Sequence, residues 1–284
     1  MVTVEHLYHD YAGKGAYAVK DVSFEIADGE VFGFLGPSGA GKSTTQNILT
    51  GLLPMQKGKA AVGGCDVKKP NDQFFNLIGV SFEQSNVYDK LTGLENLEFY
   101  RSLFSVPTME PKKLLDMVGL TNAAKKRAGA YSKGMKHRLT FARSMINNPR
   151  MWFLDEPTTG LDPAIAEGII NIVRERNQKG ATVFLTTHNM HVADQLCDRV
   201  AFINNGELLL IDSPKNLKLQ YGQKLVEVEY GENGDLKKET LSFVDENDRK
   251  KLGRIAESGN VQMMHTMEAT LEQIFITVTG RGLV

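Results

Sequence analysis

A glycine-rich run, GPSGAGKST at Gly36–Thr44, has the residue types needed to hold a chain of phosphates. Glycine tolerates the backbone conformations in which successive N–H groups converge on an anion. The apolar run Val31–Leu35 precedes it and a helix-compatible segment, Lys42–Thr50, follows, so the positive end of a helix would face the phosphates. Lys42 would reach the β- and γ-phosphates, and the Ser43 hydroxyl would bind Mg²⁺. The pattern predicts a nucleotide site.

Two adjacent carboxylates, Asp155 and Glu156, follow the apolar run Met151–Leu154. Such a run is typical of a buried strand, and open α/β sheets bind their ligands at the carboxyl ends of their strands. Asp155 in that place would orient Mg²⁺ through its water shell. Glu156 would polarise an attacking water as a general base. The two acids therefore predict hydrolysis of the nucleotide as well as its binding.

The composition indicates a globular chain. Of its 284 residues, 42% are hydrophobic and 24% charged, as expected for one large α/β domain with a small appendage. The net charge of −1 provides no field to attract nucleic acid, so we expect no nucleic-acid partner. No apolar run approaches the roughly 18 residues of a membrane span, and no signal peptide is evident at the N-terminus. Cys65 and Cys197 lack metal-ligand spacing. We expect a soluble intracellular protein with reduced thiols.

Alternating strands and helices must position these groups. Apolar, β-branched or aromatic runs predict five buried strands, and helical patterns separate several of them. This alternation favours an α/β fold with a mostly parallel sheet covered on both faces. The predicted strands are Val31–Leu35, Leu77–Phe82, Met151–Leu154, Thr182–Leu185 and Val200–Ile203, and the predicted helices are Lys42–Thr50, Leu94–Phe104, Lys136–Ile146 and Pro163–Gln178.

Three further regions differ from this pattern. The short segments Val2–Tyr8, Val22–Ile26 and Ala60–Val62 predict an antiparallel ribbon attached to the main sheet. Residues 86–147 lack strand signals and predict a helical insertion, opened by a capping box at Thr92. From about residue 221 a hairpin of 226–230 and 240–244 around a turn at 231–234, then a final helix opened by Thr270, predict an α+β appendage. The predicted domains are 1–220 and 221–284.

At this point the chain resembles the ATP-binding subunit of ABC transporters over about residues 1–220. Tyr11 stands where the family stacks an aromatic residue on adenine, and GPSGAGKST stands as its Walker A loop. YSKGM at 131–135 takes the place of the LSGGQ signature, FLDEP at 153–157 is Walker B, Gly160–Asp162 is the D-loop, and Thr186–His188 carries the switch histidine. Six motifs in the family's order imply a P-loop ATPase fold.

The resemblance implies a role for each matching residue. His188 would donate to the γ-phosphate and anchor the attacking water, beside Glu156 and Lys42 as the catalytic groups. Ser132 and Gly134 would contact the γ-phosphate of an ATP bound by a second copy. The residues implied in ATP binding are Tyr11, Gly36, Pro37, Ser38, Gly39, Ala40, Gly41, Lys42, Ser43, Thr44, Ser132, Gly134 and Asp162, and those implied in Mg²⁺ binding are Ser43, Glu83 and Asp155.

Two motifs depart from the family's pattern. Lys133 and Met135 replace the usual Gly and Gln of the signature, a combination that resembles export-type ATPases, of the drug- or sodium-exporter kind, rather than importers. In the Q-loop, counting back without gaps from Leu91–Asn96 places Glu83 where the family has glutamine, whereas a shift of one residue would place Gln84 there. Glu83 would still offer an oxygen to Mg²⁺ or its water but would add negative charge beside the phosphates.

The expected function is therefore an ATPase that drives export. ATP would join two copies head to tail, as a homodimer or with a paired ATPase subunit, and hydrolysis would separate them. Because this chain has no span, integral-membrane permease subunits must be other polypeptides, contacted through about Ser85–Tyr100, which places the chain peripherally on the cytoplasmic face of the membrane. The alternatives are an ABC ATPase acting on nucleic acid or ribosomes, which typically carries a coiled coil or two ATPase units, and an importer ATPase. The cargo is not readable from the sequence.

Overall fold

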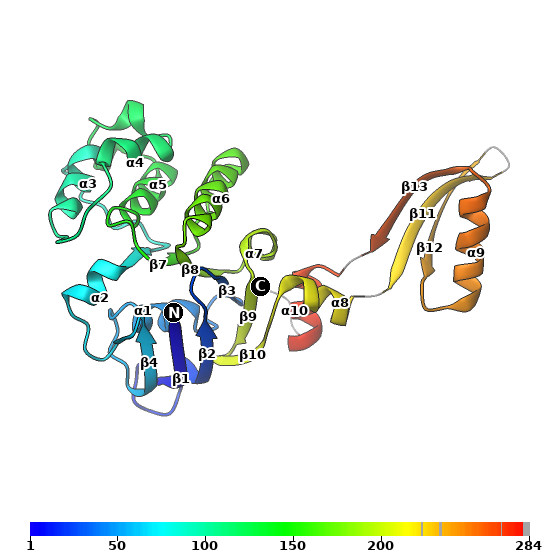
Figure 1. Cartoon of the computed structure of the whole chain (residues 1–284), viewed down its shortest axis with the longest axis horizontal. Coiled ribbons are helices and arrows are strands. Elements are labelled where there is room, and N and C mark those ends of the chain that lie inside the picture. The colour runs from blue at the N-terminus through cyan, green and yellow to red at the C-terminus, as the bar shows by residue number, and fades with distance from the viewer. Residues whose placement is uncertain (223, 233–234, 268, 281–284) are drawn as a thin grey trace. The chain divides into compact units, whose positions relative to one another are not determined.

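Two compact units make up this computed structural model, which describes residues 1–222, 224–232, 235–267 and 269–280. The first unit is Met1–Asp212 and the second begins at Ser213. The division lies before the predicted boundary at residue 220, because helix α8 (Pro214–Tyr221) packs against α10 (Leu271–Thr279) near the end of the chain. Figure 1 shows the elements of both units.

A six-stranded sheet forms the centre of the first unit. Its strand order is β10-β9-β3-β8-β7-β6, and all neighbours are parallel except β10 and β9. The strands are β3 (Val31–Leu35), β6 (Ile78–Ser81), β7 (Met151–Asp155), β8 (Thr182–Thr187), β9 (Arg199–Asn204) and β10 (Glu207–Asp212). Because β3, β8, β7 and β6 run in one direction, the loops that follow them meet at one edge of the sheet. The predicted parallel sheet is confirmed.

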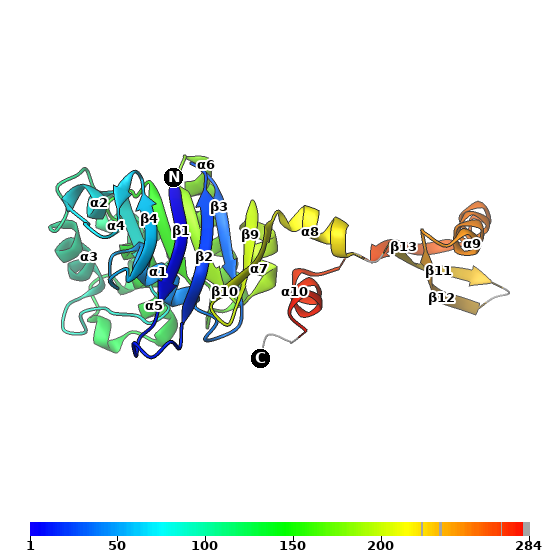
Figure 2. The same ribbon diagram turned by 90° about the horizontal axis from the view of Figure 1, so that it is seen from below.

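An antiparallel sheet covers part of the first unit, as predicted from the N-terminal segments. Its order is β2-β1-β4-β5, with β1 (Val2–His9), β2 (Val19–Ile26), β4 (Lys57–Val62) and β5 (Cys65–Asp66). Figure 2 shows β1, β2 and β4 side by side. Phe24 of β2 stacks on Phe32 of β3 at 5.4 Å and also meets Phe34 and Phe184, so aromatic rings join the two sheets in one core.

Helices pack on the central sheet and form the expected insertion. Helix α1 (Lys42–Leu49) contacts β4, β7 and β8, and α7 (Met190–Leu196) contacts β3, β8 and α6 (Pro163–Gln178). Between β6 and β7 lie α3 (Gly93–Arg101), α4 (Pro111–Met117) and α5 (Lys133–Arg143), grouped apart from β1, β2 and β4 (Figure 1). The short α2 (Asp72–Leu77) precedes β6, and the 3-10 turns Thr121–Ala123 and Ala128–Ala130 lie before α5.

Local capping signals set where two of these helices begin. Thr92 and Glu95 form the predicted capping box of α3, with Thr92 Oγ1 accepting from the Glu95 N–H at 3.1 Å. Ser132 caps α5 by accepting from the Met135 N–H at 3.2 Å. Helix α5 therefore begins at Lys133 rather than at the predicted Lys136, because the serine cap, and not the first apolar residue, fixes the start.

The second unit contains a three-stranded antiparallel sheet with one helix on it. Strands β11 (Leu225–Glu232), β12 (Asp235–Ser242) and β13 (Val261–Met267) lie in the order β12-β11-β13. The helix α9 (Glu246–Glu257) buries Ile255 against Val226, Val228, Tyr230 and Leu241. Residues 233 and 234 of the predicted turn lie outside the described residues.

The second unit differs more from what its sequence predicts. The hairpin is real, but its second strand is β12 and ends at Ser242, whereas residues 240–244 were expected to form it. Helix α9 and strand β13 were not predicted. The final helix α10 begins at the Thr270 capping box as expected and packs against α8, while α9 covers the hairpin. None of the helices in the described part of the chain is long and apolar enough to cross a membrane.

Candidate functional site

The phosphate loop connects β3 to α1 in a conformation that requires glycine at two places. A Cβ atom at Gly36 would lie 2.2 Å from the Ile203 carbonyl oxygen, and one at Gly41 would lie 2.5 Å from the Ala18 carbonyl oxygen. Gly41, the N-cap of α1, also has φ 106°, which side chains rarely allow. No side chain caps α1 among the described residues, so its first N–H groups remain suited to an anion.

The Lys42 side chain folds back onto the phosphate loop. Its side chain is 7% exposed, and its ammonium donates to the carbonyl oxygens of Gly36 at 2.7 Å and Pro37 at 2.9 Å. Burial lowers the pKa of Lys42, while the nearby carboxylates of Glu156, Asp155 and Glu83 act in the opposite direction. Incoming phosphates would replace these carbonyls as partners of the ammonium and would favour its charged form.

Asp155, at the end of β7, faces the phosphate loop. It accepts hydrogen bonds from Thr186 Oγ1 and, at 3.4 Å, from Ser43 Oγ. Burial raises the pKa of Asp155; the hydrogen bonds from Thr186 and Ser43 lower it, and the charges of Glu156 and Glu83 raise it further. A carboxylate disfavoured by burial and like charges gains from a bound cation, and hydroxyl and carboxylate oxygens are the ligands Mg²⁺ takes.

Glu156 is held on both carboxylate oxygens. One accepts from the His188 N–H at 2.8 Å and from His188 Nδ1 at 2.6 Å, and the other accepts from Thr187 Oγ1 at 2.9 Å and Thr159 Oγ1 at 3.1 Å. Because a carboxylate only accepts, Nδ1 of His188 carries the proton in this contact. Glu156 is 4% exposed and has φ 49°, a left-handed conformation that costs a non-glycine residue about 1–2 kcal/mol. Hydrogen bonds thus hold this side chain in place, and the surrounding structure maintains the strained backbone beneath it.

A cavity of about 300 Å³ joins these groups at the carboxyl edge of the sheet. It brings together the phosphate loop, the end of β7, His188 after β8 and Glu83 after β6. The lining residues are Ser38, Gly39, Gly41, Lys42, Ser43, Thr44, Glu83, Asp155, Glu156 and His188. Of the two Q-loop alternatives it is Glu83 that lines this cavity.

Tyr11 lies beside the start of α1. Its hydroxyl is 3.1 Å from Thr44 Oγ1, its ring packs edge-on against His9, and its side chain is 64% exposed. Asp10 supports this loop by accepting from the N–H groups of Ala12 at 2.9 Å and Gly15 at 2.6 Å. Burial raises the pKa of Asp10, but the backbone donors outweigh it, and the net pKa is lowered. An exposed ring next to the phosphate loop is suited to stacking on a base.

Gly36, Pro37 and Ala40 belong to the phosphate loop without lining the cavity, and Tyr11 lies beside that loop, but three other predicted residues lie on separate elements. Ser132 is exposed at the start of α5, Gly134 lies in the first turn of that helix, and Asp162 is exposed at the start of α6. Within one copy these residues do not join Lys42 and Glu156. They therefore belong to a different surface of the chain.

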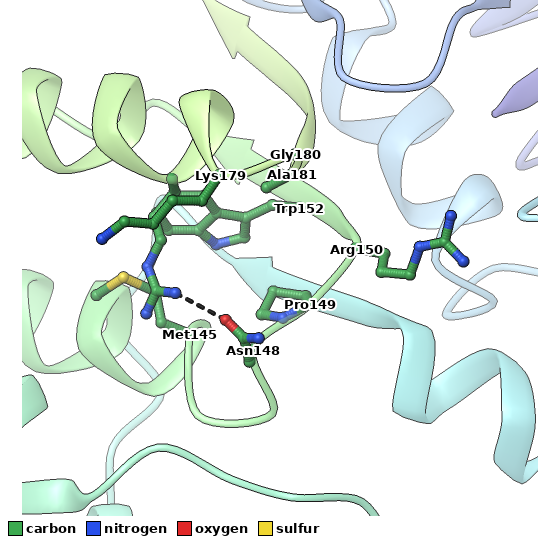
Figure 3. Close-up of a pocket in the computed structure, with 9 residues that line it drawn as sticks. Met145, Asn148, Pro149, Arg150, Trp152, Lys179, Gly180 and Ala181 are labelled. Carbon is green, nitrogen blue, oxygen red and sulfur yellow. Dashed lines mark hydrogen bonds between the residues drawn. The ribbon is translucent and has the colours of Figure 1, made fainter.

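A second hollow, shown in Figure 3, lies away from all predicted site residues. It has a volume of about 90 Å³ and lies where β7 and β8 begin. Trp152 of β7 and Ala181, which precedes β8, are among the residues that line it. There Arg176 donates to Asn148 Oδ1 at 2.7 Å. It marks the amino end of the sheet, opposite to the edge where open α/β sheets bind ligands.

Sequence reasoning gave no role to several polar residues that support the site. Thr187 and Thr159 orient Glu156, Thr186 orients Asp155, and Asp10 shapes the loop of Tyr11. The two threonines at the end of a buried strand, Thr186 and Thr187, were a usable signal, since buried hydroxyls require partners. In the part of the chain that the structure describes, no group of three His, Cys, Asp or Glu side chains is arranged to hold a metal ion.

Comparison with known proteins identifies sequences similar to this one. The family described as "ABC transporter" matches residues 19–159. A fluoroquinolones export ATP-binding protein of Mycobacterium tuberculosis is 44% identical over 284 residues, covering all of this chain and 94% of that protein. The linearmycin resistance ATP-binding protein LnrL of Bacillus subtilis is 36% identical over 226 residues, covering 78% of this chain and 72% of that protein.

Solved structures share the fold of most of the chain. A dimeric ATP-binding cassette in a post-hydrolysis state, bound to ADP and phosphate, has a TM-score of 0.69 and 28% identity, covering 75% of this chain and 98% of that one. An ATP-binding subunit of an ABC transporter has a TM-score of 0.71 and 25% identity, covering 78% of this chain and 93% of that one. The predicted P-loop ATPase fold is thereby confirmed.

Proposed function

Because the chain belongs to the ATP-binding subunits of ABC transporters, we propose that it hydrolyses ATP to drive export through separate membrane-spanning subunits. The observation that carries this proposal is the convergence of Lys42, Glu83, Asp155, Glu156 and His188 on one cavity at the sheet edge. The cavity has the groups needed to bind phosphates and to activate a water molecule.

Each group in the cavity has a separate task. The phosphate-loop amides and Lys42 bind the β- and γ-phosphates, and Tyr11 stacks on the adenine. Ser43 and Asp155 would hold Mg²⁺, which neutralises phosphate charge when bound. Glu156 takes a proton from the attacking water. His188, which donates from Nδ1 to Glu156, fixes the orientation of that carboxylate.

Two copies complete the site. Ser132, Gly134 and Asp162 lie on the surface outside the cavity of their own chain, where a second chain can meet them. The exposed N-terminal end of α5 is a favourable partner for an anion. We infer that Ser132 and Gly134 bind the γ-phosphate of the partner's ATP, so that ATP joins the two copies head to tail.

A groove between β6 and the helical insertion supports contact with a membrane subunit. Its volume is about 560 Å³, and Phe75 and Leu103 in its lining are 47% and 62% exposed. Arg143 at the end of α5 also lines it and donates to the Asn86 carbonyl at 2.6 Å and to the Tyr100 hydroxyl at 3.0 Å. A partner seated there would act on α5 and hence on Ser132. We propose that this contact holds the chain on the cytoplasmic face of the membrane.

Transport by the assembled exporter tests this function. The mycobacterial relative is named for fluoroquinolone export, so we propose a drug of this class as a cargo. We expect inverted vesicles that contain this chain and the membrane protein encoded beside it to accumulate a fluorescent fluoroquinolone when ATP is added. Vesicles with Glu156→Gln in place of the wild type are the control and should not accumulate it. Accumulation that is equal with and without ATP would contradict the proposal.

Replacing Glu83 separates hydrolysis from transport in the same vesicles. Glu83 lines the cavity and directly follows Phe82, which lines the groove together with Val80 of β6. We expect Glu83→Gln to retain transport, because the amide still offers an oxygen to Mg²⁺ or its water. Glu83→Ala should retain hydrolysis but lose transport. Full transport by the alanine variant would refute the contact between Glu83 and the metal.

Lys133 tests the charge of the signature segment. It is exposed and lies between Ser132 and Gly134, where its ammonium would attract the partner's phosphates. We expect Lys133→Gly to raise the KM for ATP by about twofold to fivefold at low salt, as for an exposed ion contact, and less at high salt. Steady-state hydrolysis at two ionic strengths measures this. A KM unchanged at low salt would leave Lys133 as an ordinary solvated charge.

A further inference from the structure

A buried histidine joins the signature helix to the loop after Glu156. His137 of α5 is 5% exposed, and its Nε2 lies 2.9 Å from the carbonyl oxygen of Pro157. A carbonyl oxygen only accepts, so Nε2 carries the proton and donates. Replacing this donor by an apolar group would leave a buried carbonyl without that partner, and such losses are expensive.

A second contact lies one turn closer to the start of the helix. A Cβ atom placed on Gly134 would lie 3.5 Å from Leu161 Cδ2, so the Leu161 side chain covers that part of α5. We call the pair of contacts, His137 with Pro157 and Gly134 with Leu161, the α5–loop contact. It holds the first two turns of α5 against residues 157–161.

The same loop is tied to Glu156. The Thr159 N–H donates to the Glu156 carbonyl at 3.2 Å, and Thr159 Oγ1 donates to its carboxylate at 3.1 Å. Movement of the loop relative to β7 must therefore disturb the carboxylate. Ser132 and Gly134 at one end, and Glu156 at the other, are connected through a short series of hydrogen bonds and packed side chains.

We propose that His137 is a positioning residue that couples the two ATP sites of the dimer. This rests on the proposed function, in which Ser132 and Gly134 bind the partner's ATP and Glu156 serves the chain's own. When α5 binds the partner's ATP, the α5–loop contact determines where residues 157–161 lie. These residues in turn orient Glu156 through Thr159. Occupation of one site thus prepares the other for hydrolysis.

Substitution of His137 tests the coupling. His137→Leu keeps an apolar side chain of useful size but removes the donor, whereas the Nε2 amide of His137→Gln can take the place of the ring Nε2. We expect His137→Leu to lower kcat about tenfold, the effect of one lost buried hydrogen bond, and to reduce the Hill coefficient for ATP to about 1. Its single-copy affinity for ATP should not change. His137→Gln should restore both values.

Glu156→Gln and Leu161→Ala complete this test. If Glu156→Gln with native His137 does not dimerise with ATP, the proposed function fails and not this coupling alone. If it dimerises and His137→Leu keeps the wild-type kcat and Hill coefficient, or if His137→Gln falls as far as His137→Leu, the coupling is overturned. Should His137→Leu not fold, Leu161→Ala loosens the contact from the loop side, and an unchanged Hill coefficient in that variant overturns the proposal.

Discussion

Replacement of Glu156 by glutamine should lower the turnover of ATP by a factor of about 100 or more, the usual contribution of a general base. Glutamine has the same shape, and its oxygen can accept from His188 as the carboxylate does. Its amide N–H₂ can donate to the Thr187 and Thr159 hydroxyls, which turn to accept. We therefore expect the fold and ATP binding to survive while hydrolysis is lost.

Phosphate release and binding of a fluorescent ATP analogue measure the two effects separately. Glu175→Gln is a matched control, since Glu175 lies on α6 in an exposed pair with Lys179. Such exposed pairs contribute little, so this control should keep full activity. A Glu156→Gln variant that hydrolyses ATP at a rate near that of the wild type would exclude Glu156 as the base.

Gly134→Ala should preserve the fold of a single chain but should lower ATP hydrolysis by the dimer. In the chain itself an added Cβ meets only Leu161 Cδ2, at the ordinary contact distance of 3.5 Å, and alanine is a better helix former than glycine. The melting temperature should therefore stay the same or rise. In the proposed dimer the added methyl group, two residues from Ser132, would reduce the space left for the partner's phosphates. Because misplacement of reacting groups by about 1 Å costs about 100-fold, we expect a loss of this order in kcat.

Thermal melting and steady-state hydrolysis together check this combination. The matched control is Gly168→Ala in α6, where an added Cβ meets nothing within 4 Å. It should change neither hydrolysis nor ATP affinity. If Gly134→Ala hydrolyses ATP normally, the N-terminal end of α5 does not contact the nucleotide of a second copy. If Gly134→Ala unfolds, the space beside Gly134 within one chain is too small for a methyl group, contrary to the expectation.

The parts of the site whose geometry depends on residues close together in the sequence could be predicted from it. The glycine and lysine spacing of the phosphate loop and the acids after a strand determine local geometry through short-range sterics and strand direction. The Thr92 capping box is equally local, and the structure contains it. Asp155, Glu156 and His188 accordingly lie on one cavity, as their places after parallel strands required.

Contacts between segments distant in sequence could not be predicted. The hydrogen bond from His137 to Pro157 and the packing of Leu161 over Gly134 depend on how α5 lies against the loop after β7. The second unit shows the same limit, because α9 is mostly charged and its single buried residue, Ile255, gives a weak helical stripe. Strand β13 has largely exposed side chains, so alternation did not reveal it.

The mass of Glu156→Gln in solution tests most directly whether ATP is held between two copies. Light scattering coupled to gel filtration, with ATP and Mg²⁺ in the buffer, should give twice the mass found without nucleotide. The same variant that also carries Gly134→Ala should keep the mass of one copy, since its own phosphate loop is intact but the partner's ATP has lost its second contact surface. A Glu156→Gln mass that ATP does not change, or equal dimerisation of the doubly substituted chain, would contradict a composite site formed by two copies.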